Sequence, residues 1–571
     1  MKLLPTRFLP ERPMRLPRLR PYVPQPGDPP IFWFNSERDD IVREVVRRVV
    51  EAKAQSGQME LVLNDVAYHE TERLEKQRDV ESRESLGFWR GVLRRVGRMS
   101  DAEKKETLRS ITDHMVRDIA GNFDPRVYAL ATKAVPKLLT GVMSPSKLHT
   151  AILQQHPKAL DDLLITQGPI EKLQRLAKQG TLVFVPTHSS NLDSIVLGYA
   201  LMREQLPPVS YGAGKNLFSN PIISFFMHNL GAYRLDRRIK AGLYKDALKA
   251  YSTVLLERGY HSLFFPGGTR SRSGLIEQHL KLGLAGTAVE AFARNQVRSI
   301  ERPLWFVPTT INYALVLEAE SLIEDHLKEQ GKARYIIDED DEFSSIDRWV
   351  DFFRKLSHLS SACVLRFGEP MDPYCNAVDA EGHSLAPDGR VIEAGSYVRR
   401  RDVPSLDAAR DAGYTTALGE AVAERFLRET VIMSTQLVAH VLFRAIVAAT
   451  PNTDLFGRMR YKGDIAMPVE RLHAEVGEAR DAVLALERGG FVHGSPALHT
   501  DTPEILVERA LQFWTGYHTN LVAKRVGAEV VCEDPALLHY YGNRLVPFAT
   551  RIAPESLAAA AREIALMGHV S

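Results

Sequence analysis

Apolar and polar positions divide the chain into segments with different periods. From residue 35 to about residue 155, apolar side chains recur at helical spacing, as at Ile41, Val45 and Val49. Apolar residues three or four positions apart form one stripe of a helix, so this segment is predicted to be helical. From about residue 172 short apolar runs alternate with helical patterns, and from residue 405 to the end the helical period returns.

Four short apolar runs in the middle of the chain predict buried strands. They cover residues 181–186, 262–266, 304–308 and 362–367, and a helical pattern at residues 194–203 follows the first. Strands that alternate with helices are typical of α/β domains, in which helices pack on the faces of a sheet. We therefore expect an α/β fold with a mixed sheet flanked by helices, between helical N-terminal and C-terminal regions.

The same patterns give expected boundaries along the chain. A proline-studded tail covers residues 1–34 and a helical N-terminal region covers 35–158. The α/β domain is expected at 159–375, a loop insertion with turn signals at 376–404, and a helical C-terminal region at 405–571. A chain of 571 residues is too long for one hydrophobic core, which agrees with a division into several parts.

Charge is balanced over the whole chain, with 73 basic and 71 acidic residues and a formal net charge of +2. The molecule as a whole is therefore not a polyanion binder, and any basic function must be local. In the tail, arginines alternate with prolines that disfavour a helix. Such a tail either lies on anionic lipid or forms a solvated arm. No nucleic-acid partner is expected, because no recognised binding fold accompanies the basic residues.

Residues 85–99 form a second basic segment, in which Phe88, Trp89 and Val92 alternate with arginines. This amphipathic helix either packs on its own core, which is the commoner case, or lies on a membrane surface. The chain has no run of about 20 apolar residues, so a soluble or peripheral protein is expected. Its three cysteines lack metal-ligand spacing and fit a reducing cytoplasm, so neither a disulfide framework nor a metal site is indicated.

Candidate catalytic residues follow the first predicted strand. His188 comes directly after it, and Asp193 lies five residues further on. An aspartate that accepts a hydrogen bond from one imidazole nitrogen fixes the tautomer, and the other nitrogen can then remove a proton from a substrate hydroxyl. The carboxyl end of a buried strand is also where α/β sheets bind ligands.

The His-x4-Asp spacing alone is weak, because the chain repeats it at His156 and His383 without a preceding buried strand. The segments that follow His188 strengthen the prediction. An arginine cluster lies at residues 231–238, in which Arg234 could instead pair with Asp236. Next comes Phe-Phe-Pro-Gly-Gly-Thr-Arg-Ser-Arg-Ser-Gly at residues 264–274, where glycines expose backbone N–H groups and two arginines add charged donors for a phosphate. Val307-Pro308 then ends the third predicted strand.

These four ordered segments resemble the four motif blocks of the glycerophospholipid acyltransferase superfamily, which carries a His-x4-Asp motif. The resemblance is closer to the larger glycerol-3-phosphate and dihydroxyacetone-phosphate acyltransferases, on account of Gly214-Lys-Asn-Leu217, the paired Arg237 and Arg238, and Asn312-Tyr313 after the fourth block. It covers residues 180–320 firmly and the helical flanks in general character.

The resemblance implies a transfer of a fatty acyl group from acyl-coenzyme A or acyl carrier protein to the sn-1 hydroxyl of glycerol-3-phosphate, the first step of phospholipid synthesis. The alternatives are dihydroxyacetone phosphate or lysophosphatidate as acceptor, or a non-catalytic lipid-binding scaffold. His188 would be the general base and Asp193 its orienting partner, and no cofactor or metal is implied. The protein would be cytoplasmic and peripheral on the inner face of a membrane. The residues expected to bind the acceptor are Lys215, Arg237, Arg238, Gly268, Thr269, Arg270 and Arg272.

The third block departs from the family pattern at Gly267, where relatives have glutamate. If that glutamate orients the acceptor or the arginines, its absence leaves the identity of the acceptor open. The second glycine could instead widen the phosphate loop. Because His188 and Asp193 are both present, we expect catalysis to survive.

Overall fold

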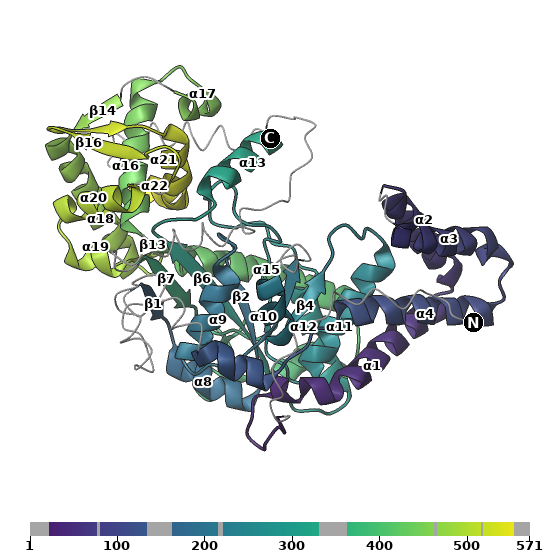
Figure 1. The fold of residues 1–571 in the computed structure, drawn as a ribbon. Coiled ribbons are helices and arrows are strands. Elements are labelled where there is room, and N and C mark those ends of the chain that lie inside the picture. Colours follow the sequence, from purple (N-terminus) through teal and green to yellow (C-terminus); the bar gives the residue numbers. More distant parts are fainter. Residues whose placement is uncertain are drawn as a thin grey trace.

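The computed structural model describes residues 22–76, 80–133, 163–214, 221–330, 362–461, 465–515 and 518–552. A central sheet flanked by helices lies between two groups of helices. The N-terminal helices project from one end of the sheet, and the C-terminal elements gather beyond the other end (Figure 1). In the described parts of the chain, no helix combines the length and the apolar character needed to cross a bilayer.

The N-terminal helices pack around their own apolar cluster, which continues onto the edge of the α/β domain through Tyr233 and Tyr251. Trp89 and Val92 of the basic segment are buried in this cluster, so the apolar face of that helix packs inward. The last long helix begins with a capping box between Ser100 and Glu103, which satisfies its first N–H groups. The elements are η1 (Pro30–Trp33), α1 (Phe34–Gln55), α2 (Met59–Glu75), α3 (Val80–Arg95), η2 (Val96–Arg98) and α4 (Asp101–Ile119).

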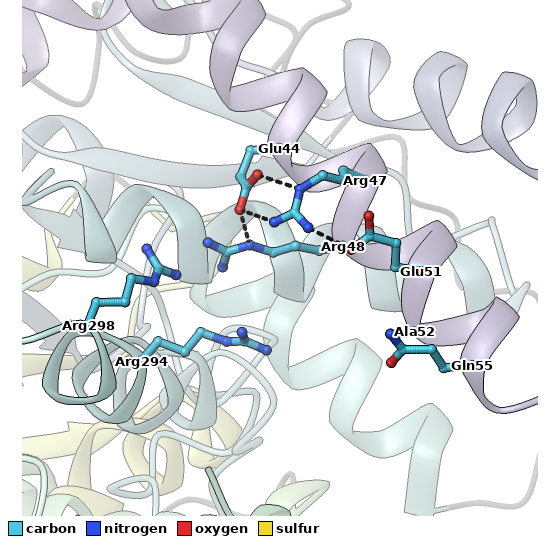
Figure 2. A pocket seen from close by; sticks show the side chains of 8 residues that line it. All are labelled: Glu44, Arg47, Arg48, Glu51, Ala52, Gln55, Arg294 and Arg298. Carbon is cyan, nitrogen blue, oxygen red and sulfur yellow. Dashed lines mark hydrogen bonds and ion pairs between the residues drawn. The ribbon is translucent and has the colours of Figure 1, made fainter. Parts of the chain in front are cut away.

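A cleft of about 520 Å³ separates α1 from the α/β domain. Figure 2 shows side chains of α1 on one side and Arg294 and Arg298 on the other. Behind it the buried carboxylate of Glu257 accepts from Arg48 at 2.6 and 2.7 Å and from Arg298 at 2.6 Å. Since each arginine of the cleft pairs with a carboxylate, the cleft is an ion-pair network that joins α1 to the α/β domain.

The central sheet has seven strands in the order β1-β7-β6-β2-β5-β3-β4. The five strands from β6 to β4 are parallel, whereas β7 is antiparallel to β6 and β1 pairs in parallel with β7. The expected mixed sheet is therefore present. The strands are β1 (Leu164–Gln167), β2 (Thr181–Pro186), β3 (Ser210–Gly214), β4 (Ala232–Leu235), β5 (Ser262–Leu263), β6 (Leu304–Tyr313) and β7 (Cys363–Phe367).

Two sequence predictions about the sheet need correction. The strand expected to end at Pro308 continues to Tyr313, because residues 309–313 pair with β7 on one side. Strands β1, β3 and β4 were not predicted, since each is only four or five residues long and two of them contain glycine or charged residues. The strand expected at residues 262–266 contains only Ser262–Leu263, and residues 232–235 within the arginine cluster form β4.

Helices cover the sheet and carry its parallel connections. Strand β2 is buried at every position, as expected for a strand covered on both faces. The helices are α8 (Ile170–Gln179), α9 (Asp193–Arg203), α10 (Pro221–Asn229), α11 (Gly242–Glu257), α12 (Ala285–Val297), α13 (Ala319–Gln330) and α15 (Ala408–Arg428), of which α15 contacts β6 and α12. The segment expected as a loop insertion contains short pieces: β8 (Ala377–Val378), β9 (Ser384–Leu385), β10 (Val391–Ile392), η6 (Ala394–Val398), β11 (Arg399–Arg400) and β12 (Val403–Pro404).

The C-terminal part is mainly helical, as expected, and its apolar residues belong to the same cluster as the core of the sheet. It also contains a three-stranded sheet, β14-β17-β16, that the sequence patterns did not indicate. Its elements are β13 (Val431–Ile432), α16 (Ser434–Ala449), α17 (Leu455–Met459), β14 (Ile465–Pro468), α18 (Val469–Arg488), β15 (His493–Gly494), α19 (Pro496–Thr500), α20 (Pro503–Trp514), β16 (Ala523–Val526), β17 (Glu529–Cys532), α21 (Pro535–Gly542), η7 (Asn543–Phe548) and α22 (Ala549–Ile552).

Candidate active site

His188 and Asp193 form a hydrogen-bonded pair at the carboxyl end of β2. Nδ1 of His188 lies 2.8 Å from Oδ2 of Asp193. The aspartate is fully buried and the histidine side chain is 16% exposed, so the imidazole lies between the core and the surface. With Nδ1 engaged by a carboxylate, Nε2 is the nitrogen left to exchange a proton with a substrate.

Asp193 is held by more than the histidine. Its Oδ2 accepts the backbone N–H groups of Ser189 at 2.7 Å and Ser190 at 3.0 Å, and its Oδ1 accepts the hydroxyl of Tyr313 at 2.8 Å. Asp193 is also the first residue of α9, where the helix dipole favours a negative charge. These donors stabilise a buried carboxylate and fix its orientation toward the imidazole.

The loop after β5 lies against His188, because β5 is the neighbour of β2 in the sheet. The ring of Phe265 stacks on the imidazole with centroids 4.2 Å apart, and the Ser271 N–H donates to the carbonyl of His188 at 2.8 Å. Gly268 has a φ of +72°, in the region that favours glycine, and Thr269 beside it is half-buried. The predicted phosphate loop is therefore adjacent to the predicted base.

The segment after β6 completes the site from the other side of β2. The buried carboxylate of Glu318 accepts the Ser190 hydroxyl at 2.8 Å and the Asn191 N–H at 2.9 Å. Nη1 of Arg270 lies 3.6 Å from Glu318, and burial raises the pKa of this carboxyl to about 7. Arg272 approaches Asp325 of α13 at 4.0 Å. Both predicted arginines of the third block thus lie at this edge of the sheet.

The C-terminal part contributes side chains that the sequence did not assign to the site. Buried Arg544 donates to the Ser189 hydroxyl at 2.8 Å, and Asn543 donates to the carbonyl of Ser273 at 2.6 Å. Burial lowers the pKa of Arg544. Arg544 lines a small cavity together with Ser189 and Tyr313. Only the cluster Tyr-Tyr-Gly-Asn-Arg at residues 540–544 marked this region in the sequence, and a contact across more than 350 residues is invisible to local patterns.

The second-block arginines are further from His188. Arg234 lies within β4, and Arg237 and Arg238 follow that strand, which is three strands from β2, or about 14 Å at the usual strand spacing. Arg238 pairs with Asp236 at 2.9 Å, and Arg237 is exposed. Arg234, for which the sequence offered a pairing with Asp236, approaches Asp118 of α4 at 3.5 Å. Lys215 lies outside the described residues.

The repeated His-x4-Asp spacings behave differently from the pair at residue 188. His383 is bonded to Asp379 at 3.0 Å rather than to Asp388, and its side chain is 58% exposed. Asp388 pairs with Arg390. His156 lies outside the described residues. Of the two spacings that lie in described residues, the one flanked by a buried strand and the start of a helix forms a buried pair, and the other does not.

Comparison with known proteins identifies sequence similarity over the α/β domain. Residues 169–311 match the family model described as Acyltransferase. A glycerol-3-phosphate acyltransferase of Pseudomonas fluorescens Pf-5 is 29% identical over 277 residues, which cover 48% of this chain and 29% of that protein. The enzyme of the same name from Pseudomonas aeruginosa PAO1 is 34% identical over 155 residues, covering 27% of this chain and 18% of that protein.

A third relative, the glycerol-3-phosphate acyltransferase of Haemophilus ducreyi, is 27% identical over 331 residues, or 56% of this chain and 37% of that protein. The chain thus matches less than two fifths of the length of these relatives. The matched family segment begins just before α8 and ends within β6, so it contains the His188–Asp193 pair and the loop after β5. Over residues 169–311 the α/β domain of this chain is therefore similar to the acyltransferase family.

Proposed function

We propose that this chain transfers a fatty acyl group from a thioester to the sn-1 hydroxyl of glycerol-3-phosphate. The observation that carries the proposal is the 2.8 Å bond between His188 and Asp193, beside a loop with two arginines. The pair supplies a base for a hydroxyl, and the loop supplies cationic donors for the phosphate of the same acceptor. The names of the relatives support glycerol-3-phosphate as that acceptor.

In this mechanism Nε2 of His188 removes the proton of the acceptor hydroxyl while its oxygen attacks the thioester carbonyl carbon. Asp193 stabilises the imidazolium that forms. The tetrahedral intermediate then collapses, the carbon–sulfur bond breaks, and the thiolate leaves with the proton from His188. The products are the acyl ester and the free thiol, so no covalent acyl-enzyme is needed.

Acceptor binding is proposed at Arg270, Arg272 and the backbone of Gly268 and Thr269. These residues lie in the loop that contacts His188. Arginine suits a phosphate because its planar donors match two phosphate oxygens. Arg237 and Arg238 would extend the cationic edge of the sheet toward β4, where the phosphate-bearing thioester carrier could also be held. Lys215 is proposed as a further contact to a substrate phosphate.

The donor is proposed to be acyl-coenzyme A or acyl carrier protein, and the place of action the inner face of a membrane. The acylated product partitions into lipid, so an enzyme at the membrane surface can release its product directly into the bilayer. The basic residues of the tail would contribute attraction to anionic lipid, about 1 kcal/mol for each residue near the surface. We propose that this reaction is the first step of phospholipid synthesis.

The test is thioester consumption by the purified chain with a long-chain acyl-coenzyme A or acyl carrier protein as donor. Glycerol-3-phosphate, dihydroxyacetone phosphate and lysophosphatidate are supplied separately, and the lipid product is identified. We expect turnover with glycerol-3-phosphate that falls at least about 100-fold in His188→Ala. His383→Ala is the matched control, because it removes an exposed histidine that also bonds an aspartate.

Each result has a definite meaning. Turnover with only one of the other two acceptors would assign that acceptor instead. Full activity of His188→Ala would reject the base. Silence with every donor and acceptor would reject the enzymatic proposal and favour a lipid-binding scaffold.

A further inference from the structure

In the loop after β5, the carboxylate of Glu277 fills the space next to the Cα atom of Gly267. A Cβ atom on Gly267 would lie 2.7 Å from Cδ of Glu277 and closer still to its Oε2. No left-handed φ requires glycine at this position, and a side chain there would force the Glu277 carboxylate out of its present place. The absence of a side chain at Gly267 and the presence of the Glu277 carboxylate are therefore linked, because the carboxylate fills the space that a side chain at position 267 would occupy.

The Glu277 carboxylate contacts the histidine of the pair. Its Oε1 accepts the backbone N–H of His188 at 2.7 Å. The carbonyl of the same residue accepts the Ser271 N–H, and Phe265 stacks on its ring. The main chain of His188 is thus held on both sides by the loop after β5, with the carboxylate as the acceptor on one side.

This carboxylate is buried, and its burial has an electrostatic consequence. Burial raises the pKa of Glu277 to about 7, while Arg544 and the N–H of His188 oppose the shift. Arg544 also donates to the Ser189 hydroxyl, next to His188. A carboxyl group kept in such a place at a cost in desolvation is expected to have a positional role, because an apolar side chain would fill the space without that cost.

We infer that Glu277 is a positioning residue that sets the main chain of His188, in place of the side chain that Gly267 lacks. The inference rests on the proposed function, in which His188 is the base. It explains why the departure at Gly267 leaves the pair with Asp193 intact. On this inference, the glycine at position 267 reflects a carboxylate that is supplied from position 277 instead, and it does not reflect a different acceptor.

The geometry predicts that the two positions are exchangeable. Oε1 of Glu277 lies 3.2 Å from the Cβ position of residue 267. Standard bond lengths place the carboxylate oxygens of a glutamate about 3 to 3.5 Å from its own Cβ. A glutamate at position 267 could therefore present an oxygen to the His188 N–H at the same point, provided that the side chain of Glu277 is removed.

The experiment is a set of variants in the full chain: Glu277→Ala, Gly267→Glu, the double variant Gly267→Glu/Glu277→Ala, and the double variant Gly267→Ala/Glu277→Ala. We expect Glu277→Ala to lower kcat for thioester transfer by about tenfold or more with a smaller change in KM. Gly267→Glu alone is expected to be impaired by collision. The Gly267→Glu/Glu277→Ala variant should return to within about threefold of the parent kcat. The Gly267→Ala/Glu277→Ala variant relieves the same collision without restoring a carboxylate, and it should stay low.

A second readout does not depend on turnover. Acylation of His188 by diethyl pyrocarbonate, followed by mass spectrometry of the modified peptide, reports how the imidazole is held. We expect faster modification in Glu277→Ala and a return to the parent rate in the Gly267→Glu/Glu277→Ala variant only. Equal values for the two double variants in both readouts would overturn the inference. If the parent chain turns over no acceptor, the proposed function fails, and the modification rates alone still decide the role of Glu277.

Discussion

At the scale of residues, the site concentrates carboxyl groups in a small buried volume. Asp193 accepts hydrogen bonds from the backbone N–H of Ser189 and the hydroxyl of Tyr313, and it is bonded to the imidazole of His188. Glu318 and Glu277 are buried with fewer compensating donors, and burial raises the pKa of each to about 7. Carboxyls with such different environments side by side are typical of functional sites, because only a function repays the cost of burying them.

The raised pKa of Glu318 predicts a pH-dependent contribution to stability. The folded protein holds this proton up to about pH 7, whereas the unfolded chain releases it near its ordinary value of 4.5. Between these pH values the folded state binds more protons, so the contribution of Glu318 to stability falls as pH rises through the folded pKa and levels off near pH 8. We expect the difference in unfolding free energy between parent and Glu318→Gln to fall by about 2 kcal/mol from pH 5 to pH 8.

Urea unfolding at both pH values measures this difference. Glu324→Gln is the control, because Glu324 lies on the next helix with a side chain that is 71% exposed. The same pH dependence for the parent and Glu318→Gln would contradict the prediction.

At the scale of elements, the ends of three neighbouring strands and one distant segment build the site. Strands β5, β2 and β6 bring the loop after β5, the His188–Asp193 pair and Glu318 together, since they are adjacent and parallel. The segment α21–η7 then covers the loop after β5. A Cβ on Gly274 would collide with the backbone carbonyl group of Tyr540: it would lie 2.9 Å from the carbonyl carbon and closer still to the oxygen. The C-terminal segment therefore helps to fix the loop that carries Arg270 and Arg272.

Arg544→Ala tests the contribution of this segment. Removing a buried cation leaves Glu277 without its nearby opposite charge, so we expect a loss of about 2–4 kcal/mol in unfolding free energy. We also expect kcat to fall at least about tenfold at a temperature where the variant is folded, because Arg544 ties Ser189 to the loop. Denaturant unfolding and steady-state kinetics measure the two effects.

Two companion variants sharpen this test. Arg544→Lys keeps the charge without the double donor geometry and should recover part of the stability and less of kcat. Arg525→Ala removes an exposed arginine paired with Glu508 and should change neither. Normal kinetics in folded Arg544→Ala would show that the C-terminal contact is dispensable for the site.

At the scale of the whole molecule, the N-terminal helices are joined to the α/β domain by both apolar and charged contacts. The apolar cluster of α1 to α4 includes side chains from β4 and α11. Beside it, the buried carboxylate of Glu257 accepts hydrogen bonds from Arg48 of α1 and from Arg298 at the end of α12. A single carboxylate therefore neutralises cations from two parts of the chain.

Glu257→Gln is expected to destabilise the protein by about 2–4 kcal/mol, because Arg48 and Arg298 lose the charge that compensates them. We expect the largest increase in hydrogen exchange in α1 and α11, which meet at this network. Hydrogen exchange with mass spectrometry and denaturant unfolding measure both effects. Glu51→Gln, which removes a carboxylate with a 44% exposed side chain from the same cleft, should change stability by no more than about 0.5 kcal/mol.

The sequence by itself determined the α/β character, the buried strands β2 and β7, and the pairing of His188 with Asp193. These depend on local patterns, since an apolar run of strand length that is followed by His188, by Asp193 and by a helical pattern is readable within a few positions. The short strands β1, β3 and β4 and the small C-terminal sheet were missed, because their few residues are stabilised by neighbouring strands more than by their own propensity.

Only the tertiary structure decided which distant side chains complete the site. Arg544 reaches Ser189 across more than 350 residues, and Glu318 reaches Asn191 because β6 lies beside β2. The role of Gly267 could also be interpreted only in the structure, because the carboxylate beside it belongs to Glu277, ten residues further along the loop. Local periodicity records which face of an element is buried, but contacts between elements arise from packing that no single segment specifies.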